Sequence, residues 1–422
     1  MSFNTISIIG LGYIGLPTAA MFASKEKKVI GVDISQHVIE TINAGRIHIV
    51  EPELDLMVKD AVKKGFLEAT CSPQSADAFL IAVPTPFLPM DSERSIPQPD
   101  LTYIQSAANS VAKVLKKGDL VILESTSPVG TTEKMAKWMA EVRLDLSFPH
   151  THGEASDIRI AYCPERVLPG QVVRELVSND RVVGGITKAC SALTIELYQL
   201  FVEGECVVTN ARTAEMAKLT ENASRDVSIA FANELSIVCE KLEINIWELI
   251  SLANRHPRVN ILQPGPGVGG HCIAVDPWFI ASSAPEEAVL IRTARQVNDS
   301  KPGWVIDRVK STLLDFLQDN PDKAIGEVTI ACYGLAFKPN IDDLRESPAV
   351  KIAQEISSFH RGITLCVEPN ISSYSGMALV DLCVASKSAD IHVLLVAHQE
   401  FESHRPESNP NYIIDTNGLW SH

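Results

Sequence analysis

Short apolar runs alternate with amphipathic stretches over the first two hundred residues. Residues 5–9 (TISII), 29–32, 78–83 and 120–123 are almost wholly apolar and are expected to be buried strands. Residues 100–115 have helical spacing and separate the last two runs. Because strands and helices alternate in this order, the pattern predicts a parallel sheet with helices on both faces.

The middle of the chain has a different pattern. Residues 213–242 contain neither Pro nor Gly and are rich in Ala, Glu and Leu, which predicts one long helix. Helical character continues to about residue 309, apart from a Pro/Gly loop at residues 263–270. A helix of this length commonly joins domains or forms an interface between subunits, so we expect one of these roles here.

A second alternation of strands and helices begins after an expected linker at residues 320–326. Apolar runs at residues 328–333, 363–367 and 391–397 predict three strands, and residues 350–359 predict a helix. The last part of the chain is therefore expected to form a second, smaller α/β domain.

The first apolar run leads directly into Gly10-Leu-Gly12-Tyr-Ile-Gly15. In such a turn the first glycine permits a tight bend, the second lets the backbone approach a pyrophosphate, and the third lets a helix pack on the strand. Asp33 follows the next predicted strand, where an acid can bind a ribose 2′-hydroxyl and repels a 2′-phosphate. The pattern predicts NAD as cofactor rather than NADP; the alternative is a purely structural glycine turn.

These features predict an α/β protein with two Rossmann-like parallel-sheet domains, joined by a long central helix and a helical dimerisation region. The expected parts are an NAD-binding domain over residues 1–210, a central helical domain with the Pro/Gly loop over residues 211–319, and a second α/β domain over residues 320–422.

Composition narrows the classes of partner. The 422 residues include 37 Lys and Arg against 52 Asp and Glu, a net charge of −15, without a basic run. We therefore expect neither a nucleic-acid partner nor binding to an anionic membrane. The nine cysteines are scattered, which argues against a disulfide framework or a zinc site, and no metal is expected. No apolar run reaches about 18 residues and no signal-peptide pattern is present, so a reduced, cytoplasmic protein is expected.

Polar residues follow two further predicted strands. Thr85 lies in Val83-Pro-Thr-Pro86, and Thr126 lies in Glu124-Ser-Thr-Ser-Pro-Val-Gly130. Ligands bind at the carboxyl ends of strands in open α/β sheets. The same residue types dominate ordinary turns, so the pattern alone leaves both interpretations open.

The segment Pro266-Gly-Val-Gly-Gly-His-Cys272 presents one thiol in a glycine-dense loop, and Asp276 follows it. Such a loop can bring backbone N–H groups close to a ligand and lower the pKa of a thiol, which would make Cys272 a nucleophile. The alternative is an inert buried cysteine, which is our interpretation of Cys163. The pattern alone leaves both interpretations of Cys272 open.

The long predicted helix carries Lys218, Asn222 and Arg225 on one face, since their spacings are four and three residues. Polar groups aligned on a largely apolar helix indicate a site, with the lysine as a base or an oxyanion partner. The alternative is a solvated stripe in which Glu215 pairs with Lys218.

Two other loops hold charges. Glu165 and Arg166 lie between two prolines, where the alternative is a surface ion pair. Lys338 and Arg345 follow the glycine turn of the second α/β domain and could meet a phosphate. That turn lacks the second and third glycines, so we expect no second NAD there.

These motifs resemble the UDP-glucose/GDP-mannose dehydrogenase family over nearly the whole chain. The resemblance implies an N-terminal NAD domain, a central dimerisation region that makes a homodimer, and a C-terminal UDP-binding domain. The variants CPERVLPG at residues 163–170 and GGHCIAVDP at residues 269–277 resemble the branch that acts on N-acetylated UDP-sugars. The implied substrate is UDP-N-acetyl-D-mannosamine, and the implied destination of the product is a cell-surface polysaccharide, the enterobacterial common antigen.

The family reaction is a four-electron oxidation of the sugar C6 alcohol with two NAD, through a cysteine thiohemiacetal and a thioester. The resemblance implies Cys272 as nucleophile, Lys218 as acid/base and oxyanion partner, Asn222 beside it, and Glu165, Thr126 and Asp276 as residues that position or activate water. The NAD contacts that it implies are Gly10, Gly12, Tyr13, Ile14, Gly15, Asp33, Thr85, Thr126 and Arg345. The substrate contacts that it implies are Arg166, Val167, Lys218, Asn222, Arg225, His256, Arg258, Gly269 and Lys338, of which Arg258 can come from a partner subunit.

The chain departs from the family pattern at Val275, where UDP-glucose relatives usually carry a lysine. This departure weakens a UDP-glucose assignment and fits the N-acetyl branch. The alternatives are UDP-N-acetylglucosamine as the sugar, a 3-hydroxyacid dehydrogenase that uses a lysine without a nucleophilic cysteine, and a non-catalytic NAD-binding protein. The substitution Cys272→Ser separates the three classes.

Overall fold

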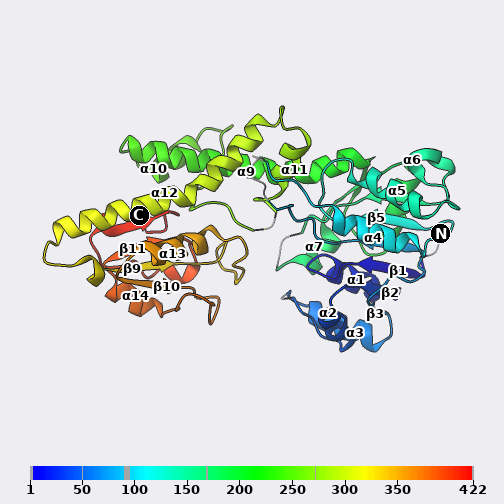
Figure 1. Ribbon diagram of the computed structural model, residues 1–422, viewed down its shortest axis with the longest axis horizontal. Helices are drawn as coiled ribbons and strands as arrows, with labels where there is room; N and C mark the ends of the chain where they lie inside the picture. The colour runs from blue at the N-terminus through cyan, green and yellow to red at the C-terminus, as the bar shows by residue number, and fades with distance from the viewer. Residues whose placement is uncertain (1–2, 50, 90–95, 168–169, 271, 421–422) are drawn as a thin grey trace. The chain divides into compact units, whose positions relative to one another are not determined.

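The computed structural model describes residues 3–49, 51–89, 96–167, 170–270 and 272–420. The chain divides into two compact units (Figure 1). The first comprises Met1–Glu221 with Ser282–Pro285, and the second comprises Asn222–Ala281 with Glu286–His422. No helix among the described residues is both long enough and apolar enough to cross a membrane.

The described residues of the first unit form an eight-stranded sheet in the order β3-β2-β1-β4-β5-β6-β7-β8. Its strands are β1 (Thr5–Ile9), β2 (Lys28–Val32), β3 (Leu67–Thr70), β4 (Ala78–Ile81), β5 (Leu120–Leu123), β6 (Arg159–Tyr162), β7 (Arg181–Gly185) and β8 (Cys206–Asn210). All neighbouring strands are parallel except β6 and β7, which pair antiparallel. The predicted parallel sheet is thus mixed at one pair, because alternation of strands and helices does not fix the direction of strands near an edge.

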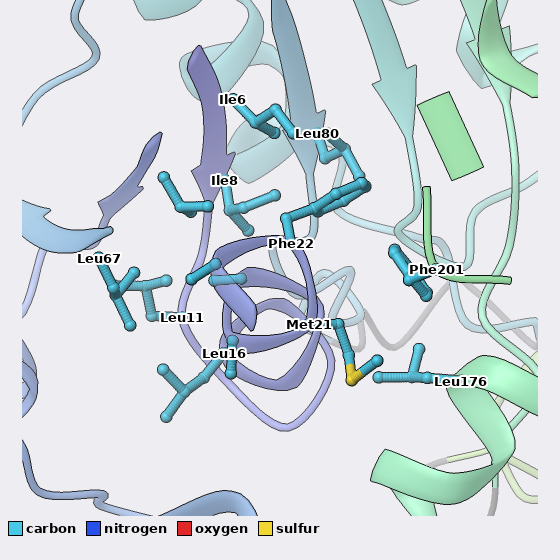
Figure 2. Close-up of a cluster of buried hydrophobic side chains, with 14 of the residues drawn as sticks. Ile6, Ile8, Leu11, Leu16, Met21, Phe22, Leu67, Leu80, Leu176 and Phe201 are labelled. Carbon is cyan, nitrogen blue, oxygen red and sulfur yellow. The ribbon is translucent and has the colours of Figure 1, made fainter. Parts of the chain in front are cut away.

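Helices cover both faces of this sheet. They are α1 (Gly15–Ser24), α2 (Gln36–Asn43), α3 (Leu54–Lys63), α4 (Thr102–Ala112), α5 (Thr131–Val142), α6 (Pro149–His152), α7 (Val172–Ser178) and α8 (Lys188–Tyr198). Because side chains alternate along a strand, Ile6 and Ile8 of β1 face the core that includes α1, whereas Ile9 belongs to the core of the other face. Figure 2 shows Ile6, Ile8 and Leu80 beside Phe22 of α1. Every residue of α1 from Gly15 to Ala23 is buried, so the glycine turn is held on a packed base.

Four helices follow, and the boundary between the two units falls inside the first of them. They are α9 (Ala211–Lys241), α10 (Ile246–Ala253), α11 (Asp276–Ser283) and α12 (Val289–Asp319). The long helix predicted at residues 213–242 corresponds to α9. The last helix continues beyond residue 309 to Asp319, with Pro302 inside it.

The second unit contains a parallel sheet of four strands among its described residues, in the order β10-β9-β11-β12. The elements are β9 (Thr329–Tyr333), α13 (Pro348–Phe359), β10 (Ile363–Val367), α14 (Leu382–Ser388), β11 (Ile391–Leu394) and β12 (Ile413–Asp415). Apolar side chains of α12 and α13 pack with those of β9 and β11 in one core. The prediction of an α/β chain with two such sheets is confirmed.

Candidate active site

The glycine turn between β1 and α1 has the geometry of a dinucleotide site. Gly10 adopts a φ of 92° and donates its N–H to the carbonyl of Val32 at 2.8 Å. A Cβ on Gly10 would lie 2.6 Å from the Ala82 oxygen, and one on Gly15 would lie 1.8 Å from the Gly10 oxygen. A Cβ on Gly12 would have no described atom within 4 Å. Packing therefore explains the first and third glycines, whereas the second borders open space and fits the approach of a pyrophosphate.

Asp33 lies at the end of β2, beside this turn. Its two carboxylate oxygens accept hydrogen bonds from the N–H groups of Leu11, at 3.0 Å, and Ser35, at 2.9 Å. The side chain is half-buried, and Tyr13 in the turn is 40% exposed while Ile14 is half-buried. Since each carboxylate oxygen can accept a second hydrogen bond, Asp33 fits a ribose hydroxyl donor.

The loops after β4 and β5 are joined at the carboxyl edge of the sheet. Ser125 donates its hydroxyl to the carbonyl of Val83 at 2.7 Å. Thr126 is half-buried, and the hydroxyl of Thr85 is buried with no hydrogen-bond partner among the described residues. A buried hydroxyl without a partner is costly, so Thr85 fits a position that a ligand completes.

Glu215 holds the loop after β5 against α9. Its carboxylate accepts hydrogen bonds from Gly130 N at 2.5 Å, Thr132 N at 2.8 Å and the Thr132 hydroxyl at 2.6 Å. Burial raises the pKa of Glu215, while these hydrogen bonds lower it. The alternative of a solvated Glu215–Lys218 pair is therefore wrong, because Glu215 is fully buried. Lys218 follows on α9 and is half-buried.

Glu165 and Arg166 follow β6 and have different partners. Glu165 is 7% exposed, and its carboxylate pairs with the guanidinium of Arg181 at 2.7 Å. Arg166 pairs with Glu221 of α9 at 2.7 Å. The alternative of a surface ion pair between Glu165 and Arg166 is therefore wrong. Each of these two residues is held by a partner far away in the sequence.

The two motifs that carry the resemblance are described only in part, since residues 168–169 and 271 lie outside the described residues. Val167, at the edge of the first motif, is half-buried, and Cys272, in the second, is exposed. Cys163 is buried, and burial raises the pKa of its thiol to about 12, as expected of a packing residue.

A hydrogen bond links the cysteine loop to α9 within the second unit. Asn222 donates its side-chain amide to a carboxylate oxygen of Asp276 at 2.5 Å. Asp276 is 2% exposed and donates its N–H to the carbonyl of Cys272 at 2.9 Å. The structure therefore brings three of the predicted catalytic residues into one connected group.

The same loop packs against the glycine turn after β9. A Cβ on Gly269 would lie 2.9 Å from the Cβ of Phe337, so no larger residue fits there. Lys338, the next residue in that turn, is exposed. Arg345 is also exposed and pairs with Asp343 at 2.5 Å. The second unit thus supplies two cations close in sequence to residues that contact the cysteine loop.

The remaining predicted substrate residues are exposed. Arg225 lies one helical turn after Asn222 on α9. His256 and Arg258 follow α10, and the N–H of Arg258 donates to the His256 Nδ1 at 3.3 Å.

Two buried residues that support the cysteine loop escaped the sequence analysis. Arg295 of α12 is fully buried, pairs with Asp226 at 2.5 Å and reaches the carbonyl of Ile273 at 3.5 Å. Asn233 of α9 accepts a hydrogen bond from the N–H of Gly265 at 2.9 Å. Two long helices therefore hold the loop near both of its ends. The available signal was a polar residue on the packed face of each helix.

Comparison with known proteins identifies the family. The NAD binding domain model of the UDP-glucose/GDP-mannose dehydrogenase family matches residues 4–202. The central domain model matches residues 212–300, and the UDP binding domain model matches residues 331–422.

Relatives match over the whole length. The UDP-N-acetyl-D-mannosamine dehydrogenases of Yersinia pestis and Escherichia coli K12 are 64% and 62% identical, with all of both chains covered. An NDP-N-acetyl-D-galactosaminuronic acid dehydrogenase of Ralstonia nicotianae is 60% identical, with 100% of this chain and 97% of that protein covered. A solved UDP-D-ManNAc dehydrogenase from Pyrococcus horikoshii is 38% identical, with a TM-score of 0.83 over 98% of this chain and 96% of that chain. The chain therefore belongs to the UDP-glucose/GDP-mannose dehydrogenase family and is an NAD-dependent UDP-sugar dehydrogenase.

Proposed function

We propose that the protein oxidises UDP-N-acetyl-D-mannosamine at C6 to UDP-N-acetyl-D-mannosaminuronate, using two NAD. The observation that carries the proposal is the exposed Cys272, on a glycine loop whose Asp276 is hydrogen-bonded to Asn222. Full-length identity of 64% to a relative that bears this substrate in its name supports the choice of sugar. The product would feed synthesis of the enterobacterial common antigen.

The chemistry assigned to this chain is covalent. The thiolate of Cys272 captures the C6 aldehyde as a thiohemiacetal, whose oxidation gives a thioester that water hydrolyses. A covalent intermediate divides a difficult oxidation into easier steps and retains the reactive aldehyde. Lys218 acts as acid/base and stabilises the oxyanions, with Asn222 beside it. NAD, when bound, accepts the hydride in each oxidation.

Glu165, Thr126 and Asp276 position or activate water in this proposal. Of these, Glu165 and Asp276 are buried, and each is held by a partner, Arg181 for Glu165 and Asn222 for Asp276. A base that is fixed in orientation loses less entropy on the way to the transition state than a free surface carboxylate.

The UDP moiety is negatively charged, and because the chain as a whole is acidic, cationic side chains must lie close to the diphosphate. The cations proposed for this are Lys338, Arg225, Arg258 and Arg166. Further substrate contacts are proposed from Val167, His256 and Gly269. Arg345 is proposed as a contact of NAD. Three of the cations are exposed, and Arg166 is about one-third exposed, which leaves them accessible to phosphates.

The other assignments concern assembly and organisation. We propose a cytoplasmic homodimer, divided into an NAD domain, a central helical domain and a UDP domain at residues 210 and 320. Large apolar side chains on α9 and the segment after it are exposed, namely Phe231, Val238, Leu242 and Ile244. Burial of such side chains against a second copy would stabilise a dimer.

The choice of sugar needs its own test, because relatives of nearly equal identity are named for different N-acetylated sugars. We expect kcat/KM to be highest for UDP-N-acetyl-D-mannosamine in a panel with UDP-N-acetylglucosamine, UDP-N-acetylgalactosamine and UDP-glucose. A higher value for UDP-N-acetylglucosamine would move the assignment to that sugar and leave the chemistry unchanged.

The substitution Cys272→Ser tests the chemistry. We expect it to reduce net oxidation by at least about 1,000-fold, because the thioester cannot form. Cys383→Ser is the matched control, since Cys383 is also exposed but lies on α14. Wild-type turnover by Cys272→Ser would favour a 3-hydroxyacid dehydrogenase mechanism without covalent catalysis.

A further inference from the structure

Two buried glutamates of the first unit lie close to one arginine. Glu124 directly follows β5, Glu165 follows β6, and Arg181 begins β7. Together with Tyr198 at the end of α8, all four side chains belong to residues that are at most 7% exposed. The reaction chemistry assigned above uses only Glu165, so the presence of the other three residues needs an explanation.

Both carboxylate oxygens of Glu165 are held, one of them by Arg181. Its Nη1 lies 2.7 Å from the Glu165 Oε2, and the other Glu165 oxygen accepts the N–H of Arg166 at 2.7 Å. The guanidinium carbon lies 4.7 Å from the centre of the Tyr198 ring and 5.9 Å from that of Phe201. Cation–π contacts in a desolvated site hold an arginine in place, so its orientation is transmitted to Glu165.

Glu124 is held by a different partner. Its Oε1 accepts the hydroxyl of Tyr198 at 2.6 Å, and its Oε2 has no hydrogen-bond partner among the described residues. Burial raises the pKa of Glu124 to about 7, although the charge of Arg181 lowers it. One guanidinium cannot neutralise two buried carboxylates at equal cost, and the direct ion pair goes to Glu165.

We propose that Arg181 is a positioning residue that orients Glu165 for thioester hydrolysis, and that Tyr198 keeps Glu124 from competing for Arg181. The inference rests on the proposed function. In the step concerned, water adds to the thioester carbonyl and gives a proton to Glu165. The C–S bond then breaks, and the sulfur leaves as the thiolate of Cys272 while the acyl group becomes the carboxylic acid.

The substitution Arg181→Met should slow hydrolysis more than the two oxidations. We expect about 100-fold slower hydrolysis, the usual size of a general-base contribution, with hydride transfer changed by less than about fivefold. After mixing with UDP-N-acetyl-D-mannosamine and NAD, an acid-quenched sample should show the acyl adduct on Cys272 by intact mass. Arg181→Lys restores the charge and should recover at least about tenfold of the lost rate.

The matched control is Arg143→Met. Arg143 pairs with Asp145 and donates to two backbone carbonyls in the first unit, without contact to Glu165. The Arg143→Met variant should hydrolyse the thioester at the wild-type rate. The proposal is overturned if folded Arg181→Met shows no adduct and wild-type turnover, or if it slows both hydride transfers and hydrolysis by the same factor.

If Arg181→Met does not fold, Tyr198→Phe alone and together with Glu124→Gln tests the proposal instead. Tyr198→Phe keeps the ring under the guanidinium but releases Glu124, so hydrolysis should slow about fivefold as Glu124 competes for Arg181. Adding Glu124→Gln removes the competing charge and should restore the rate. Wild-type hydrolysis by Tyr198→Phe, or no rescue by the second substitution, overturns the proposal.

Failure of this inference is distinguishable from failure of the proposed function. If wild-type protein releases two NADH per sugar and Cys272→Ser does not, the function stands whatever the Arg181 variants do. If wild-type protein releases one NADH per sugar and no variant ever carries an adduct on Cys272, both the function and the inference fall.

Discussion

In each of the two sheets, the first strand along the chain leads into a glycine turn, but only one of the two turns is open to a ligand. Gly10 follows β1 and Gly334 follows β9, with φ values of 92° and 85°. Each donates its N–H at 2.8 Å to the last residue of the neighbouring strand, Val32 in one case and Val367 in the other. The backbone geometry at the start of the two turns is therefore nearly identical.

The acids that follow those neighbouring strands differ in accessibility. Asp33 is half-buried and accepts a hydrogen bond from the N–H of Leu11 at 3.0 Å. Glu368 accepts the corresponding N–H of Leu335 at 2.7 Å, but its side chain is fully buried and pairs with His398 at 3.1 Å. The first acid can bind a ribose, whereas the second is already committed to the protein.

The third residue of each turn, Gly12 or Ala336, also differs in accessibility. Gly12 is exposed and borders open space, whereas Ala336 is 1% exposed. A helix follows the first turn at Gly15, but α13 begins only at Pro348. A strand-to-glycine turn is therefore not by itself a dinucleotide site. An open third position, an accessible acid and an adjoining helix are also required.

Among variants of the two turns, the largest change in NAD affinity should come from a side chain added at Gly12. Gly12→Val is expected to raise the KM for NAD at least about 100-fold, because the side chain occupies the space that the pyrophosphate needs. The melting temperature should change little, since a Cβ there meets no described atom. NAD titration and thermal unfolding measure both quantities. Ala336→Val is the counterpart and should destabilise the protein while leaving the KM for NAD unchanged; the reverse outcome would contradict the comparison.

A smaller loss of NAD affinity is expected from a substitution of Asp33, the accessible acid. Asp33→Asn should weaken NAD binding about tenfold, the cost of replacing a charge-assisted hydrogen bond by a neutral one. Discrimination against NADP should narrow at the same time, because the repulsion of a 2′-phosphate is lost. Glu368→Gln is the matched variant in the other sheet and should leave both cofactor constants unchanged. An equal effect of the two substitutions would show that the acids are equivalent after all.

The smallest effect concerns stability in acid. Burial alone would raise the pKa of Glu368, but hydrogen bonds from His398, Leu335 and Asn370 lower it to about 2. A carboxyl whose pKa is depressed on folding stabilises the protein above its unfolded value of 4.5, and that stability is lost as the pH falls toward 2. At pH 4 the loss should be under about 1 kcal/mol. Denaturant unfolding of wild type and Glu368→Gln at pH 6 and pH 4 checks this, and an unchanged pH dependence in the variant would contradict it.

Continuous apolar runs bounded by turn residues made part of the fold predictable. The predicted bounds at residues 5–9, 120–123 and 363–367 are those of β1, β5 and β10. The glycine turn and Asp33 were predictable for the same reason, since their spacing is local. Strand β8 was missed because it lies at the edge of the sheet, with Val207 and Val208 exposed, and so forms no buried run.

Long-range pairs could not be predicted from local patterns. The spacing makes Glu215 a candidate partner of Lys218, yet its carboxylate accepts the N–H of Gly130, which is distant in the sequence. Arg181 begins an ordinary apolar strand, and nothing near it in the sequence indicates that its partner is Glu165. Buried charges require partners, but the fold rather than the spacing supplies them.

The covalent mechanism is tested by the number of NADH released per sugar when limiting UDP-N-acetyl-D-mannosamine is oxidised to completion in excess NAD. The covalent double oxidation at Cys272 predicts a value near two. A value near one would mean that the reaction stops at the aldehyde, and would contradict the role proposed for the cysteine loop.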